Sequence, residues 1–156
     1  MCLYIMYMVS PIGDIEVCAN NHAVISVTFV DHRKKEYPNH ICRQAVQQLS
    51  EYFQLKRQVF DLPLQLTCTP FQKKVYGALQ KIPYGQVCSY QDIAKFIQRP
   101  KASRAVGMAN KKNPILIIIP CHRVIGKSGA FIGYNKGLDR KEFLLKLEQQ
   151  RKPSTS

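Results

Sequence analysis

The hydrophobic pattern of the chain changes about midway, and this change limits the folds that the chain can adopt. Residues 3–10 and 23–30 are rich in β-branched and aromatic side chains, and turn residues flank a third such segment at 15–19. These patterns predict three strands in an antiparallel meander. Residues 39–57 then place apolar side chains at helical spacing, so we expect a helix that covers the sheet.

The second half of the chain has a helical pattern instead. Residues 58–70 are extended and broken by proline, which is typical of a link between two parts. Helices are predicted over 70–82, which begins with a proline, and over 137–150, which closes the fold. The fold class is therefore α+β, with an N-terminal α/β domain over 1–66 and a C-terminal helical domain over 67–152.

A pair of short helices is expected inside the C-terminal part. The segment 89–98 begins with Ser89 as a candidate N-cap and has Asp92 three residues later, which is typical of a capping box. A basic segment at 99–112 follows after a short break. Two short helices with a tight connection, the second of them basic, favour a helix-turn-helix.

Charge is distributed unevenly between the two halves. Residues 1–66 carry six basic and six acidic side chains, whereas residues 67–156 carry 17 basic and four acidic ones, so the net charge of +13 lies in the second half. An electrostatic field with so much positive charge on one half of the chain favours a polyanionic partner, with nucleic acid as the leading candidate. No apolar run approaches the roughly 18 residues of a transmembrane helix, so no membrane partner is expected.

The cysteines are predicted to be free thiols. The start of the chain has neither a basic n-region nor a small-residue cleavage site, so we expect an intracellular protein in a reducing compartment. No Cys-x-x-Cys spacing occurs, and therefore no metal site is predicted. Five of the six cysteines are expected to be small buried hydrophobic residues, and only Cys121 is a candidate for chemistry.

Cys121 follows an apolar run that must be buried. Five aliphatic residues at 115–119 lead through a proline into Cys121 and His122. A thiol is nucleophilic as the thiolate, and a nearby imidazole favours that form. The imidazole in turn needs an acceptor, and Glu148 is the best candidate because it follows Leu147 on the inward face of the last predicted helix.

Several motifs resemble those of the O6-alkylguanine-DNA alkyltransferases, also called methylated-DNA–protein-cysteine methyltransferases. The segment "IPCHRVIG", preceded by Asn113-Pro114 and "SRAVGMAN", is similar to the active-site signature of that family. "SPIGDIEV", "PYGQVCSYQDIA" and "GLDRKEFLLKLE" resemble further family segments, so the resemblance covers nearly the whole chain. It implies a ribonuclease-H-like N-terminal domain and a C-terminal domain with a helix-turn-helix.

The resemblance also implies roles for five residues of a reactive site. Cys121 matches the cysteine that accepts the alkyl group from the O6 oxygen of guanine, and His122 matches the residue that deprotonates it through a water. Glu148 matches the carboxylate that orients the histidine. Asn113 matches the asparagine that ties the reactive loop to the helix-turn-helix. Tyr90 matches the tyrosine that crowds the phosphate and donates a proton to the leaving guanine.

Other matched positions are implied to contact DNA or the flipped base. Arg104 matches the arginine that enters the minor groove and fills the gap left by the rotated nucleotide. The further DNA-contact candidates are Ala102, Ser103, Gly107 and Lys111, and the base-pocket candidates are Val124, Tyr134 and Asn135.

These positions imply a DNA repair protein that acts once. It would move the alkyl group from O6-alkylguanine, and from O4-alkylthymine, irreversibly to Cys121. The expected partner is double-stranded DNA with the lesion; we expect a cytoplasmic monomer, or a nuclear one in a eukaryote, and no cofactor. Two alternatives stay open: a module that flips and flags damaged guanine without chemistry, and a Cys-His hydrolase that turns over many times.

Overall fold

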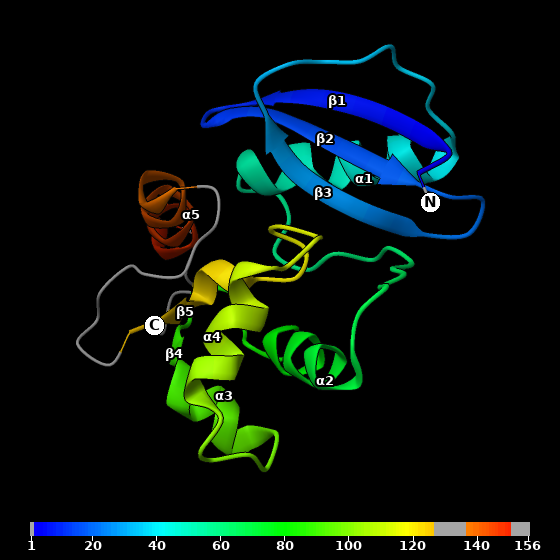
Figure 1. Ribbon diagram of the computed structural model, residues 1–156. Coiled ribbons are helices and arrows are strands. Elements are labelled where there is room, and N and C mark those ends of the chain that lie inside the picture. The colour runs from blue at the N-terminus through cyan, green and yellow to red at the C-terminus, as the bar shows by residue number, and fades with distance from the viewer. Residues whose placement is uncertain (1, 127–136, 151–156) are drawn as a thin grey trace. The chain divides into compact units, whose positions relative to one another are not determined.

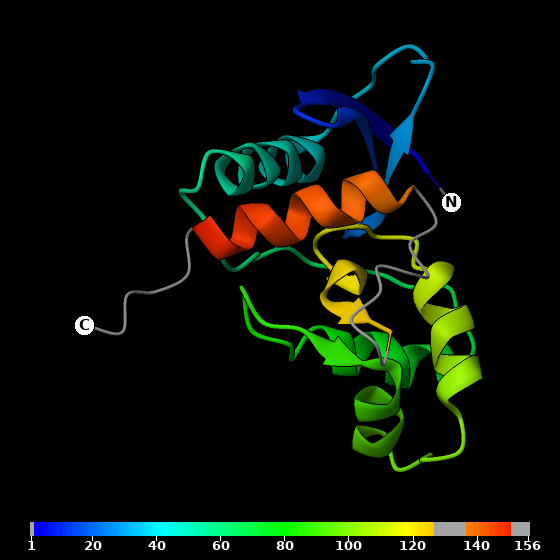
Figure 2. The same cartoon turned by 90° about the vertical axis from the view of Figure 1, so that its left-hand side faces the viewer.

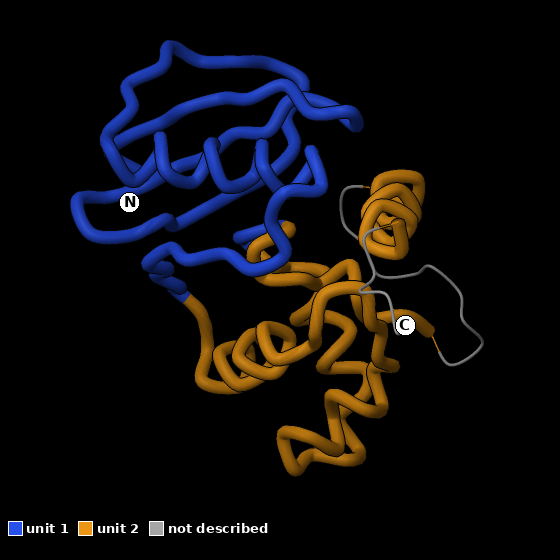
Figure 3. The backbone as a smooth tube through the Cα atoms, turned by 180° about the vertical axis from the view of Figure 1, so that it is seen from behind, with its two compact units in different colours: residues 1–67, 114–116 blue, residues 68–113, 117–156 orange. Residues whose placement is uncertain are grey.

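The computed structural model of the protein describes residues 2–126 and 137–150. Its backbone divides into two compact units (Figure 3). Unit 1 comprises residues 1–67 and 114–116, and unit 2 comprises residues 68–113 and 117–156. The chain therefore returns briefly to unit 1 just before the Pro-Cys-His-Arg segment. The α+β class predicted from the sequence is confirmed.

Unit 1 is built on a three-stranded antiparallel sheet in the order β1-β2-β3. The strands are β1 (Tyr4–Ser10), β2 (Gly13–Ala19) and β3 (Val24–Val30). The turn between β1 and β2 closes at the pair Ser10 and Gly13, where Gly13 has a φ of 126° that favours glycine. The predicted meander is confirmed, and its most buried side chains include Ile15, Val17 and Val24.

Helix α1 (His40–Phe53) packs against this sheet, as expected (Figure 1). Asn39 caps its first turn by accepting a hydrogen bond from the backbone N–H of Cys42. Its inward side chains recur at helical spacing and include Ala45, Leu49 and Tyr52, all with no exposed surface. The helix ends four residues before the predicted boundary at residue 57, where Leu55 already has a positive φ of 62°.

Part of the apolar run belongs to unit 1. Ile115 pairs with Val27 as an isolated parallel bridge beside β3. The Val27 N–H donates to the Pro114 carbonyl at 2.9 Å, and the Leu116 N–H donates to the Val27 carbonyl at 3.0 Å. On the same strand, Val24 forms a bridge with Leu64 of the extended link. These two short pairings add further segments of the chain to the sheet. The residue pattern of the strands does not predict them.

Unit 2 contains three short helices that pack on one another (Figures 1 and 2). They are α2 (Pro70–Leu79), α3 (Tyr90–Phe96) and α4 (Ser103–Lys111). The capping box predicted for Ser89 and Asp92 is confirmed, and Thr69 forms a second one with Gln72. These caps explain why helices of seven to ten residues begin where they do.

The segment after the apolar run forms a turn rather than a strand. The run is buried, as predicted, but Ile117 has a φ of 70°, which is rare for a β-branched residue and redirects the chain. A 3₁₀ turn, η1 (Cys121–Arg123), follows. The two-residue strand β5 (Val124–Ile125) then pairs in parallel with β4 (Cys88–Ser89), and α5 (Leu138–Gln150) packs against η1.

Candidate active site around Cys121

Cys121 begins the 3₁₀ turn of unit 2 and has only 1% of its surface exposed. Burial raises the pKa of its thiol to about 11, although the Asn113 side chain and the charge of Lys141 pull in the opposite direction. The resting thiol is therefore protonated at neutral pH. A protonated, buried thiol reacts slowly with oxidants and bulk electrophiles, so a partner group must activate it.

Glu148 of α5 and the next two residues of the turn form a buried cluster. His122 Nε2 lies 2.6 Å from Glu148 Oε2. Arg123 donates from Nε to Glu148 Oε1 at 2.8 Å and from Nη2 to Glu148 Oε2 at 3.1 Å. Both carboxylate oxygens are thus engaged, and the Gly85 N–H also donates to Oε1 at 3.1 Å. The sequence expectation that Glu148 faces His122 agrees with this geometry.

The protonation of this cluster follows from its contacts. Burial by itself raises the pKa of Glu148, but the charges and hydrogen bonds of His122 and Arg123 outweigh burial and hold it far below its usual range. Burial, together with the charges of Arg123 and Lys141, lowers the pKa of His122 more than Glu148 raises it, so the imidazole is neutral. An ionised carboxylate only accepts, so His122 Nε2 carries the proton. His122 Nδ1 is then a buried acceptor without a hydrogen-bond partner among the described residues.

Two asparagines fix the backbone of the reactive turn. Asn113 Nδ2 donates to the Ile119 carbonyl at 2.8 Å. Asn110 Nδ2 donates to the Cys121 carbonyl at 3.2 Å and links the turn directly to α4. Sequence reasoning named Asn113 and missed Asn110. The available signal was an amide at helical spacing from Val106 on the inward face of α4, because a buried amide requires a hydrogen-bond partner.

Tyr90 is the first residue of α3 and is half buried. Burial raises the pKa of its phenol, and a negative charge on Cys121 would raise it further, whereas a hydrogen bond with Asn110, which also contacts the turn, lowers it. Its ring also lies opposite Gly107 of α4, where an added Cβ would meet the Tyr90 carbons Cδ1 and Cε1 at 3.9 Å. The turn, α3 and α4 therefore converge at Tyr90.

The remaining candidates differ in their surroundings. Arg104 and Lys111 are exposed on α4, and Ser103 donates to Gln91 Oε1 of α3 at 2.7 Å, so this hydroxyl joins the two helices. Val124 is fully buried, and Ala102 is the residue before α4. Tyr134 and Asn135 lie outside the described residues.

Lys141 of α5 is a further buried cation that sequence reasoning missed. Its side chain has no exposed surface, and its Nζ donates to the Val124 carbonyl. In the sequence it stands within a run of charged residues in the first turn of a helix, where a lysine is normally solvated. The charged neighbours of Lys141 in the sequence therefore gave no indication that its side chain is buried.

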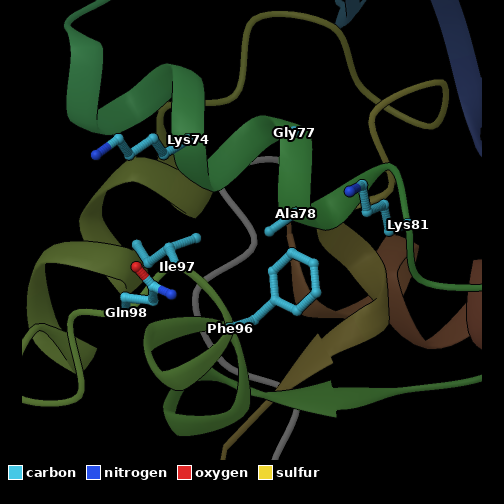
Figure 4. A pocket seen from close by; sticks show the side chains of 7 residues that line it. All are labelled: Lys74, Gly77, Ala78, Lys81, Phe96, Ile97 and Gln98. Carbon is cyan, nitrogen blue, oxygen red and sulfur yellow. The ribbon is translucent and has the colours of Figure 1, made fainter.

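A separate groove in unit 2 lies between α2 and the end of α3, with a volume of about 350 Å³ (Figure 4). Lys81 lies over the ring of Phe96 at 5.4 Å in this groove. No residue of the Cys121 cluster lines it. Among residues 2–126 and 137–150, no three His, Cys, Asp or Glu side chains are grouped as metal ligands, and no helix is long and apolar enough to cross a membrane.

Comparisons with known proteins match this arrangement over nearly the whole chain. A family model described as the 6-O-methylguanine DNA methyltransferase DNA-binding domain matches residues 70–150. A second model, described as the ribonuclease-like domain of the same methyltransferase, matches residues 3–66. The second model matches within unit 1, and the first matches most of unit 2 together with residues 114–116 of unit 1.

Individual relatives carry the same description. The methylated-DNA–protein-cysteine methyltransferase of Methanosarcina acetivorans is 48% identical over 94% of this chain and 98% of its own length. The constitutive enzyme of Bacillus subtilis is 53% identical over 74% of this chain and 69% of its own length. The Mycobacterium tuberculosis protein in complex with DNA has a TM-score of 0.86 and 42% identity, covering 95% of this chain and 94% of that one.

The family models and the named relatives thus place the chain in the class of DNA-binding methyltransferases. The chain belongs to the 6-O-methylguanine-DNA methyltransferase family.

Proposed function

We propose that this protein repairs alkylated DNA by transferring the alkyl group from O6-alkylguanine to its own Cys121. The observation that carries the proposal is the buried thiol next to a neutral imidazole whose tautomer is fixed by Glu148. The family of the chain and the naming of its relatives as methylated-DNA–protein-cysteine methyltransferases support the same reaction. O4-alkylthymine is a second substrate in this proposal.

Activation of Cys121 begins with His122. The Nε2–H···Glu148 hydrogen bond leaves Nδ1 as the base, and the ionised carboxylate stabilises the imidazolium that forms. No direct hydrogen bond from the Cys121 thiol to His122 is present among the described residues, so a water relays the proton in this proposal. Arg123 holds Glu148 in place, because it donates two hydrogen bonds to the carboxylate.

The transfer is an in-line displacement at the alkyl carbon. The Cys121 thiolate forms a carbon–sulfur bond while the bond between that carbon and the O6 oxygen breaks, and the electron pair remains on guanine. Tyr90 donates its phenolic proton to the leaving guanine. The thioether product on Cys121 is stable, so each molecule acts once. No cofactor takes part in this scheme.

DNA binding supplies the access that a buried thiol needs. The target base lies inside the duplex and must rotate out before its alkyl carbon can reach Cys121. The helix pair α3 and α4 acts as a helix-turn-helix in this proposal, with Arg104 as the wedge in the gap. In this proposal Lys111 contacts phosphate, and Ala102, Ser103 and Gly107 face the DNA backbone. Val124 lines the base pocket, to which the family resemblance also assigns Tyr134 and Asn135.

Intact-protein mass spectrometry with peptide mapping tests the assignment. After incubation with a duplex that contains O6-methylguanine, one methyl group per monomer should appear on Cys121 and then saturate. Tight binding to the lesion without a mass gain would indicate a damage-flagging module. Repeated turnover of an amide substrate, without any methyl gain, would indicate a hydrolase.

A further inference from the structure

Lys141 is a charged side chain placed where proteins rarely keep one. It lies in the first turn of α5 and has no exposed surface. Removing an ammonium group from water costs several kcal/mol, even after the surroundings relax. Burial accordingly lowers the pKa of Lys141 to about 8. A lysine at such a position needs a compensating function, because an apolar residue of similar length would fill the space without that cost.

The contacts of Lys141 point to the reactive turn. Its Nζ donates to the carbonyl of Val124, three residues after Cys121. Its charge also acts on Cys121 directly, because it lowers the pKa of that thiol, and a thiolate there raises the pKa of Lys141 in return. The side chain therefore holds the backbone directly after the turn, and its charge favours the thiolate of Cys121.

The other titratable groups around this position have different partners. Arg123 contacts Glu148, so its charge is already matched by the carboxylate, and the imidazole of His122 is neutral. Tyr90 of α3 and Tyr76 of α2 also sense the charge of Cys121, and burial raises the pKa of both phenols, so they stay neutral. Among these described groups, Lys141 is the cation whose charge lowers the pKa of the Cys121 thiol.

We propose that Lys141 is a positioning residue for the transfer reaction: its buried ammonium fixes the Val124 carbonyl and stabilises the Cys121 thiolate relative to the thiol. This inference rests on the function proposed above. It assigns to α5 a second contribution beside Glu148. Glu148 acts on the base that receives the proton, and Lys141 acts on the anion that remains.

The test measures the thiol itself, so that its result does not depend on DNA repair. The full-length protein and its Lys141→Met variant are treated with iodoacetamide from pH 7 to pH 9.5, and the initial rate of Cys121 modification is followed by peptide mapping. Loss of the ammonium should lower the rate at pH 8 by about tenfold or more, which corresponds to a thiol pKa that is higher by about one unit. Lys141→Arg should retain part of the wild-type rate.

Lys146→Met is the matched control, because Lys146 lies on the same helix with a side chain that is 73% exposed. Its pH profile should match that of the wild type. A Lys141→Met protein that melts at a lower temperature but keeps the wild-type pH profile would overturn the proposal in favour of a purely structural role.

A second measurement uses the wild-type protein and stands even if the variant does not fold. Nitrogen-15 NMR of the lysine side chains should show a slowly exchanging, protonated Lys141 at pH 7. A neutral Lys141 amine at that pH would also overturn the proposal. If both results are as expected but no methyl group is transferred from DNA, the function proposed above fails while the electrostatic role of Lys141 remains.

Discussion

The two units bury different kinds of side chains. In unit 1, Ser10 is the one polar residue counted as buried among the described residues, and the core consists of aliphatic and aromatic groups. In unit 2, a similar core also encloses two amides and four ionisable side chains. These six residues are Asn110, Asn113, His122, Arg123, Lys141 and Glu148.

The buried polar and charged groups that serve the chemistry of unit 2 lower the stability of that unit. Burying charged groups is unfavourable even when they are paired, so unit 2 carries a free-energy cost that unit 1 avoids. All six groups contact the reactive turn, contact each other, or lie in the segments that hold the turn. Unit 1 provides a sheet, and unit 2 holds polar groups in a fixed arrangement around one thiol.

The largest effect is expected from removing that thiol. Cys121→Ala should abolish methyl transfer completely and should keep binding to a duplex with O6-methylguanine. Cys18→Ala in unit 1 is the control, since Cys18 is also a buried thiol but lies in a strand. Its transfer should equal that of the wild type. Methyl transfer by Cys121→Ala, measured as mass gain per protein, would show that the acceptor lies elsewhere.

The sequence predicted unit 1 more completely than unit 2. The β-branched and aromatic content of three segments predicted β1 to β3, and the helical spacing of apolar residues predicted α1. In unit 2 the capping box of Ser89 and Asp92 was predicted as well, because it is a local sequence motif. The return of residues 114–116 to β3 was not predictable, because it depends on pairing between segments distant in the sequence.

Site residues divide in a similar way. The "IPCHRVIG" motif led to Cys121 and His122, and Glu148 followed from the apolar face of its helix. Asn110 and Lys141 were missed because their neighbours in the sequence are polar or charged, which usually indicates solvent. Their burial results from tertiary packing, which a local pattern does not contain.

The next largest effect concerns the buried carboxylate. Glu148→Gln should slow methyl transfer by a factor of about 10²–10⁴, since the imidazole loses the partner that stabilises its charged form. It should also destabilise the protein by about 3–5 kcal/mol, because Arg123 keeps a buried charge without a counter-charge. Single-turnover kinetics and denaturant unfolding measure the two effects.

Glu51→Gln provides the contrasting variant in unit 1. Arg57 and Glu51 form an ion pair at 2.8 Å whose side chains are about one third exposed. Its loss should change the free energy of unfolding by less than about 1 kcal/mol. Equal destabilisation by the two substitutions would contradict the distinction between the units.

Acid should weaken the same buried cluster. The folded-state pKa of Glu148 lies below its unfolded value of about 4.3, so the unfolded chain binds more protons in that range. The stabilising contribution is therefore complete above about pH 4.3 and is lost progressively as the pH falls toward the folded-state pKa. The free energy of unfolding, measured with urea between pH 6 and pH 3, should fall less steeply with decreasing pH for Glu148→Gln than for the wild type. An identical pH dependence of the two proteins would refute this source of acid sensitivity.

A moderate effect is expected on the surface of α4. Arg104→Ala should lower the rate of transfer from duplex DNA about tenfold, equivalent to about 1.4 kcal/mol, and should affect transfer from the free base much less. Arg43→Ala, an exposed arginine on α1 of unit 1, should change neither rate. Equal losses on duplex and free base would contradict a wedge role for Arg104.

The smallest effects separate two helices within unit 2. Gly77 of α2 and Gly107 of α4 both occupy helix interiors, where replacement by alanine typically stabilises a protein by about 0.5–1 kcal/mol. An added Cβ meets nothing within 4 Å at Gly77 and only the Tyr90 ring at 3.9 Å at Gly107. Both variants should therefore melt at slightly higher temperatures than the wild type.

DNA binding should distinguish these two variants. Gly107→Ala should weaken binding to duplex DNA a few fold, because the methyl group prevents close approach of α4 to the DNA backbone, and Gly77→Ala should bind as the wild type does. Fluorescence anisotropy with a labelled duplex at fixed salt measures the difference. Unchanged affinity for Gly107→Ala would mean that α4 approaches DNA with a different face, and the charged end of the helix at Lys111 would then be the first position to test.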